Sequence, residues 1–200
     1  MRGVFDVDLH DIFYRVAHHP EVPAAFTAGS LLLGGTAWWL APRRGWVPLW
    51  AVLAGCGLAL ALASTIVRPL GFLPAAGLNP LVVMRECVVG SLSLARNYEK
   101  LNVAMLMPFA FFGTLATRRP VIIAWSCLLI SGSVEFVQGA TGVGACQARD
   151  VAHNSVGSLL GVVLAAVVLR LLGRRLSARR SRGITAEFPA APSDVVGPGR

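Results

Sequence analysis

The sequence predicts an all-α protein, a polytopic bundle of about five helices that cross a membrane. Of the 200 residues, 55% are hydrophobic and only 14% are charged, whereas an ordinary soluble domain carries about 25% charged residues. The charges are also bunched, which leaves five long runs that are almost entirely apolar. A run of about 20 apolar residues is long enough to cross the hydrocarbon core. Because backbone polar groups in lipid must be satisfied within their own segment, such runs form helices.

The five apolar runs differ in length and in the polar and charged residues that they contain. The first two contain no charged residue. The third is short and begins near the polar residue Asn102, the fourth carries Glu135, and the fifth reaches Arg170 only in its last turn. In chain order the runs are residues 22–41, 46–67, 101–117, 120–139 and 154–172.

These runs define a membrane domain at residues 22–173. Residues 1–21 form a polar and aromatic lead-in, and residues 174–200 form a basic, disordered cytoplasmic tail that ends in a stretch rich in Gly, Pro, Ala and Ser. The connection at 68–100 is too long for a plain hairpin. Its middle, 81–94, is apolar except for one arginine and one glutamate, which predicts an interfacial or re-entrant segment.

The net charge of +8 points to anionic lipid as a partner and not to nucleic acid, because the arginines cluster beside the spans. Such clusters fix the topology of a membrane protein and contact anionic headgroups. The short loops 42–45 and 118–119 also carry arginines, which favours a cytoplasmic position for them. We therefore expect the N-terminus outside and the C-terminus in the cytoplasm. The arginines that close or follow the last run are Arg170, Arg174, Arg175, Arg179, Arg180 and Arg182.

Polar side chains gather where three of the runs meet the expected outer side. One of them opens the third run, two close the fourth, and three lead into the fifth. An ionised side chain in the bilayer centre costs roughly 2.5–3.5 kcal/mol, so intramembrane ionisable residues mark functional sites. We expect one ligand-binding pocket there, lined by Asn102, Glu135, Gln138, Arg149, Asp150 and Asn154.

Several of these residues also have a structural interpretation. Glu135 could be a buried acid held by helix-end donors, and Asp150 could cap the last helix or interact with its dipole. Asn154 would hydrogen-bond across helices. His153 lies about 100° from Asn154 around the helix, which predicts that it faces the lipid headgroups.

Two pairs of residues predict how the last run is held. Gly157 and Gly161 form a G-x-x-x-G pair, which lets another helix approach closely; we expect that helix to be the fourth run. Cys87 and Cys146 both fall in predicted outer loops, where oxidation is favoured. We hypothesise a disulfide between them, with two unpaired cysteines as the alternative. The sequence has no metal-binding or phosphate-cradling motif, so neither a metal nor a cofactor is expected.

Three segments together resemble the VanZ-like family of bacterial membrane proteins. Residues 150–161 are similar to its D-x-x-x-N-x-x-G-x-x-x-G pattern, residues 135–138 to its E-x-x-Q, and residues 102–108 to its N-x-x-x-x-x-P segment. The resemblance covers roughly residues 79–169. It implies a multi-pass envelope protein whose namesake is associated with resistance to the lipoglycopeptide teicoplanin. It implies no established reaction.

Two functions are compatible with this pattern. The favoured one is binding of a lipid or lipid-linked envelope molecule, with carboxylates and amides on its headgroup and apolar helix faces along its acyl part. No catalytic activity is assigned to it. The alternative is a membrane-embedded enzyme acting on an extracytoplasmic lipid or amide, with Glu135 as general base assisted by His153 or Asp150. A proton-coupled transporter ranks last, because the cytoplasmic half of the runs has almost no polar residues.

Overall fold

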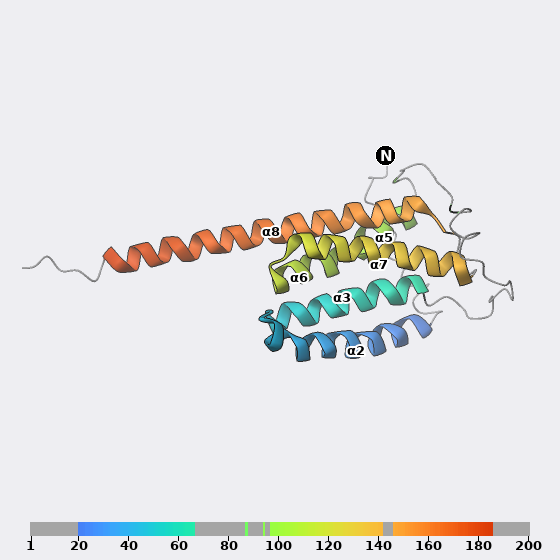
Figure 1. Cartoon of the computed structure of the whole chain (residues 1–200), viewed down its shortest axis with the longest axis horizontal. Helices are drawn as coiled ribbons and strands as arrows, with labels where there is room; N and C mark the ends of the chain where they lie inside the picture. The colour runs from blue at the N-terminus through green and yellow to red at the C-terminus, as the bar shows by residue number, and fades with distance from the viewer. Residues whose placement is uncertain (1–19, 67–86, 88–93, 95–96, 142–145, 186–200) are drawn as a thin grey trace, which may run out of the picture. The chain divides into compact units, whose positions relative to one another are not determined.

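The computed structural model describes residues 20–66, 87, 94, 97–141 and 146–185 (Figure 1). The regular elements of this part of the chain are helices. They are α2 (Glu21–Arg44), α3 (Pro48–Ile66), α5 (Asn97–Met105), α6 (Met107–Thr117), α7 (Pro120–Thr141) and α8 (Ala148–Thr185). Most of the predicted lead-in, residues 1–21, and most of the connection 68–100 with its predicted interfacial or re-entrant segment lie outside the described residues.

Five segments are long and apolar enough to cross a membrane, which confirms the predicted fold class. They are Glu21–Arg44, Pro48–Thr65, Glu99–Thr117, Pro120–Ala140 and Ala148–Arg174. The third crossing consists of two helices that meet at Leu106. The break coincides with Pro108 in the first turn of α6, because proline has no N–H to continue the ladder of the preceding helix.

Small residues hold α2, α3 and α6 close together, and α3 is the middle helix of the three. A Cβ added at Gly55 would lie 2.8 Å from the carbonyl oxygen of Leu33 in α2. One added at Gly57 would lie 2.9 Å from the backbone nitrogen of Phe109 in α6. Both distances are shorter than real Cβ contacts, so a residue with a side chain at either position would push the helices apart. Figure 1 shows α2, α3 and α7 running alongside one another.

The glycine pair of α8 packs against α5 and α6. A Cβ at Gly157 would overlap the carbonyl oxygen of Val103, and one at Gly161 would lie 2.7 Å from the carbonyl oxygen of Met107. The expectation that this pair faces the fourth run, now α7, is therefore wrong. The glycines instead contact α5 and α6, the two helices that meet at the break at Leu106. Other side chains of α8 make its contact with α7.

The two ends of the bundle differ in character. At one end, which we call the short-loop end, the backbone N–H of Val47 donates to the carbonyl of Ala116 over 3.2 Å, so the α2–α3 and α6–α7 connections lie side by side. Both helices that enter these connections finish in a left-handed residue, Gly45 and Arg118. The opposite end, which we call the polar end, contains the C-terminal turns of α3 and α7 and the N-terminal turns of α2, α5 and α8.

By packing, the chain divides into residues 1–166 and residues 167–200, and we describe them separately. In the second unit α8 continues to Thr185. Residues 174–185, the first part of the predicted disordered tail, are therefore helical; arginine, the commonest residue of this stretch, is a strong helix former.

Candidate ligand site at the polar end

Buried polar side chains from three helices converge at the polar end. Each of them is at most 8% exposed, although the surrounding helices are apolar. They are Glu99 of α5, Glu135 and Gln138 of α7, and His153 and Asn154 of α8. The predicted convergence of the third, fourth and fifth runs at one end is therefore present in the structure.

The two α7 residues tie helix ends together. One carboxylate oxygen of Glu135 accepts a hydrogen bond of 2.9 Å from the backbone N–H of Gln147, directly before α8. The side-chain amide of Gln138 donates over 2.9 Å to the carbonyl of Thr65, in the last turn of α3. Backbone groups at helix ends have no partner within their own helix. Both residues therefore supply what the ends of α8 and α3 lack, which is the structural interpretation considered for Glu135.

A charged cluster lies between α5 and α8. The guanidinium of Arg149 is 4.0 Å from the carboxylate of Glu99 and 3.7 Å from that of Asp150. It also donates a hydrogen bond of 2.8 Å to the side-chain carbonyl of Gln147. The side chain of Asn102 hydrogen-bonds to Asp150. Arg149 is 20% exposed and Asp150 14% exposed, whereas Glu99 is only 2% exposed. A ligand would therefore reach the cluster from the Arg149 and Asp150 side.

Deeper in the bundle, Asn154 links α8 to α7. Its side-chain amide donates to the hydroxyl of Ser131 over 3.0 Å. Both residues line a cavity of about 10 Å³, which is about the space that one water molecule needs. Asn154 thus has the cross-helix role that the sequence suggested.

His153 does not face the lipid headgroups. It is only 4% exposed and lies close enough to Asp150 to interact with it electrostatically. The prediction was wrong because it rested only on the angle of about 100° between His153 and Asn154 around the helix. His153 is also three residues after Asp150, so these two share a face of the helix, and that face turns towards α5.

Three neighbouring side chains of α8 have unused hydrogen-bonding atoms. Both ring nitrogens of His153 and the side-chain oxygen of Asn154 are buried and have no hydrogen-bond partner within the described part of the chain. The same holds for Oδ1 of Asp150, which lies 3.7 Å from Nε of Arg149 and is thus ion-paired without being hydrogen-bonded. A buried polar atom without a partner costs about 1–3 kcal/mol. All three residues lie in the first two turns of α8. Asp150 and His153 are near each other on the α5 side, so a single polar ligand group could satisfy atoms of both, whereas Asn154 lines the small cavity towards α7.

A cavity of about 290 Å³ lies on another side of α8, against α7. Glu135 is the ionisable residue among its described lining residues, and the others are small or apolar. Part of its wall is a disulfide between Cys87 and Cys146, whose Cα atoms are 4.7 Å apart. The cavity therefore offers an apolar space with one carboxylate in its wall.

The six predicted site residues thus fall into two groups and do not line one cavity. Glu135 faces the cavity between α7 and α8, and Gln138 is bonded to the end of α3. The other four gather on the α5 and α7 sides of α8, and they are Asn102, Arg149, Asp150 and Asn154. Among the residues that the structure describes, no group of three His, Cys, Asp or Glu side chains could hold a metal ion.

Comparison with known families agrees with the resemblance noted in the sequence. Residues 73–170 match the VanZ/LLP1 family. The protein is VanZ-like. With its five membrane-length helices it is a VanZ-like multi-pass membrane protein. No curated protein and no solved structure matches the chain.

The VanZ-like segment contains the whole charged cluster, the cavity beside Glu135 and both disulfide cysteines, whereas α2 and α3 lie outside it. Within this segment, the pocket predicted from the sequence left out Glu99, which was expected only at the outer entry of the third run, and His153, which was expected only as an assisting group of the alternative enzyme. The signal for Glu99 was its spacing: it precedes Asn102 by three residues, and the two share a helix face once the helix starts at Asn97.

Proposed function

We propose that this VanZ-like protein binds a lipid or lipid-linked envelope molecule at the polar end. The headgroup would contact Asp150, His153 and Asn154, and the apolar part would occupy the cavity beside Glu135. The single observation that supports this most strongly is the set of unused hydrogen-bonding atoms on α8. Buried atoms without partners on three residues of two helical turns are expensive for folding alone, whereas a ligand with donors and acceptors would satisfy them.

An amphiphile fits this end better than a fully polar solute. Asp150 and Asn154 offer acceptors for hydroxyls or amides, and the imidazole of His153 offers a donor and a further acceptor. The neighbouring cavity is almost entirely apolar. A ligand with a polar headgroup and an apolar chain matches both features, and it would reach the site through the membrane.

We propose that the polar end faces outward and the short-loop end faces the cytoplasm. Support comes from charge: the acidic residues of the described part are Glu21, Glu99, Glu135 and Asp150, all at the polar end. The short-loop end carries Arg43, Arg44, Arg118 and Arg119 instead, and arginines in short loops favour the cytoplasm. A reporter inserted after Gly45 should be active only in the cytoplasm. Activity only outside the cell would reverse the orientation.

The binding proposal is tested by lipid mass spectrometry on protein purified in mild detergent. Asp150→Asn keeps the shape of the side chain and removes its charge, and it should lower the amount of co-purified envelope lipid by about tenfold or more, as the loss of roughly 1.4 kcal/mol predicts. Glu21→Gln is the matched control, because it removes a carboxylate at the same end but outside the cluster. If Asp150→Asn retains the same lipids as the wild type, the site is wrongly assigned.

By analogy with the family's namesake, we further propose a link to glycopeptide resistance of the teicoplanin type. Expression in a susceptible host should then raise the teicoplanin concentration needed to stop growth. Asp150→Asn should remove the increase while the protein remains inserted at wild-type levels. An unchanged growth limit with the wild-type protein would end this part of the proposal.

A second candidate is an enzyme acting on an extracytoplasmic lipid or amide. It is favoured by one observation, the burial of His153 with both ring nitrogens unpartnered in the described structure and its proximity to Asp150. A carboxylate next to an imidazole is a common acid–base arrangement. Glu135 is less available as a general base, because one of its oxygens already accepts a hydrogen bond from the backbone N–H of Gln147. His153→Gln distinguishes the candidates: an enzyme would retain its lipid but lose turnover, detected as the absence of a product mass.

A further inference from the structure

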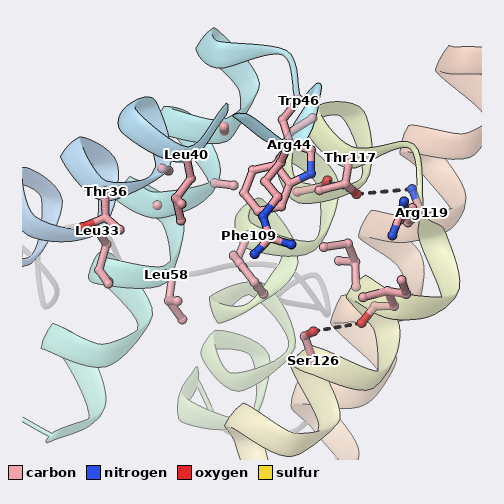
Figure 2. Close-up of a pocket in the computed structure, with 18 residues that line it drawn as sticks. Leu33, Thr36, Leu40, Arg44, Trp46, Leu58, Phe109, Thr117, Arg119 and Ser126 are labelled. Atoms are coloured by element: carbon pink, nitrogen blue, oxygen red, sulfur yellow. Dashed lines mark hydrogen bonds between the residues drawn. The ribbon is translucent and has the colours of Figure 1, made fainter. Parts of the chain in front are cut away.

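A second, larger cavity lies at the short-loop end, outside the site described above. Its volume is about 410 Å³, within the range of roughly 300–1,000 Å³ that is usual for ligand pockets. Eighteen residues of α2, α3, α6, α7 and their connections line it (Figure 2). It opens to the outside of the bundle between α2 and α7, where Thr36 and Ile122 are exposed.

The wall of this cavity is effectively apolar. The three hydroxyl groups in it donate to carbonyls of their own helices: Thr36 to Leu32 over 2.6 Å, Thr117 to Gly113 over 2.8 Å, and Ser126 to Ile122 over 2.8 Å. The other lining residues are mainly Leu, Ile, Ala, Gly, Phe and Trp. Since the hydroxyl protons are already used, the wall favours an apolar occupant.

The rim of the cavity is positively charged. Arg44, which ends α2, and Arg119, which precedes α7, are both lining residues, and the described lining residues include no acidic side chain. The hydrogen bond from Val47 to Ala116 brings their two connections together. Figure 2 shows the Arg44 side chain extending into the cavity towards Phe109.

Neighbouring arginines of the same connections do not line the cavity. Arg43 stacks on Trp39 with its guanidinium carbon 3.6 Å from the ring centre. Arg118 takes the left-handed conformation that ends α6. The two connections therefore each contain one arginine at the cavity and one beside it, which provides a matched pair of controls.

The depth of the cavity corresponds to one leaflet of a membrane. Its lining extends along α2 from Arg44 to Leu33, a distance of about 16 Å at 1.5 Å per residue. The hydrocarbon core is about 30 Å thick, so the cavity spans about half of it. An acyl chain in this leaflet would run along the apolar wall with its headgroup at the level of the arginines.

We propose that this cavity binds an anionic phospholipid, with one acyl chain between α2 and α7 and its phosphate on Arg44 and Arg119. Charge complementarity identifies the occupant: the described residues of the short-loop end carry four arginines and no acidic residue. A lipid headgroup with net negative charge matches this rim, and a zwitterionic headgroup matches it less well. The site is independent of the proposed ligand site at the polar end.

The charge requirement is tested by native mass spectrometry of the protein released from nanodiscs that contain equal amounts of phosphatidylglycerol and phosphatidylcholine. The wild type should retain phosphatidylglycerol about tenfold over phosphatidylcholine, and Arg44→Gln with Arg119→Gln should lose this preference. The control, Arg43→Gln with Arg118→Gln, changes the net charge equally and should keep it. Equal loss in both double variants would show general attraction to the loops only and would overturn the proposal, as would no preference in the wild type.

The acyl chain requirement is tested by filling the cavity. Thr36→Trp places a large ring in the opening, whereas Leu32→Trp places one on an exposed part of α2 that does not line the cavity. Thr36→Trp should reduce bound phosphatidylglycerol about tenfold and Leu32→Trp should not. Glycerol phosphate, which has the anionic group without the chain, should not compete. Full retention by Thr36→Trp, or competition by glycerol phosphate at equal concentration, would refute chain binding.

Discussion

Replacing Gly157 with alanine perturbs the contact between α8 and α5 with a single added methyl group. That group would overlap the carbonyl oxygen of Val103. A backbone oxygen fixed within a helix cannot rotate away as a side chain can, so α8 has to move outward. The shift would also separate the Asp150 and His153 side of α8 from Glu99 and Asn102.

The size of the effect follows from two opposing contributions. Alanine is favoured over glycine within a helix by about 0.5–1 kcal/mol. Overpacking a well-packed contact costs about 1–3 kcal/mol, and a clash with backbone belongs at the upper end of that range. The expected net loss for Gly157→Ala is therefore about 1–2 kcal/mol. At Gly132 of α7 an added Cβ has no contact within 4 Å. Gly132→Ala should therefore raise the stability by the helix propensity of alanine over glycine alone, about 0.5–1 kcal/mol.

The measurement is equilibrium unfolding in mixed micelles, followed by tryptophan fluorescence, for both variants under the same conditions. The difference between them isolates the packing contribution, about 1–3 kcal/mol. Equal stability of Gly157→Ala and Gly132→Ala would mean that α8 does not pack on α5 through this face. Lipid retention by Gly157→Ala then reports whether the cluster depends on the same contact.

Three further predictions concern the polar end. Asn154→Ala and Ser131→Ala should each destabilise the bundle, and the double variant should be less than additive by about 0.6–2 kcal/mol because both remove one cross-helix bond; additive losses would contradict that bond. Gln138→Leu should destabilise by about 1–2 kcal/mol in the same unfolding assay, because a carbonyl at the end of α3 loses its donor, and wild-type stability would show that the carbonyl finds another partner. Alkylation without reductant should leave Cys87 and Cys146 unmodified in protein from an oxidising compartment; four modified cysteines would contradict the disulfide.

The number of spans was predictable because run length alone decides it. A run of about 20 apolar residues can satisfy its backbone in lipid only as a helix, and five such runs give alternating directions. That alternation also predicts that the end of α7 and the start of α8 meet, so the sequence alone places Glu135, Asp150 and Asn154 at one end of the bundle.

The partner of each helix face was not predictable in the same way. The spacing of Gly157 and Gly161 defines a face of α8 for close packing, but any neighbouring helix could fill it. The choice of α5 and α6 depends on where the third crossing breaks at Leu106. The burial of His153 was not predictable for the same reason. Its imidazole is one residue away from the buried Asn154, and whether it is exposed or buried depends on which helix covers that side of α8.

The hydrogen bonds at the polar end divide its side chains into two groups with opposite mutational signatures. Glu135 and Gln138 bond to backbone groups at helix ends, so removing them should reduce stability first. His153 has two buried nitrogens without partners in the described structure, and each such atom costs about 1–3 kcal/mol.

His153→Leu should therefore raise the stability of the bundle while abolishing ligand retention, which is the usual sign of a group kept for function at the expense of stability. Asn154→Leu is the matched comparison on the same helix turn, and it should lower stability because it also removes the bond to Ser131. A His153→Leu protein that is less stable than the wild type and still retains its lipid would show that the imidazole belongs to the packing of α8 and not to the site.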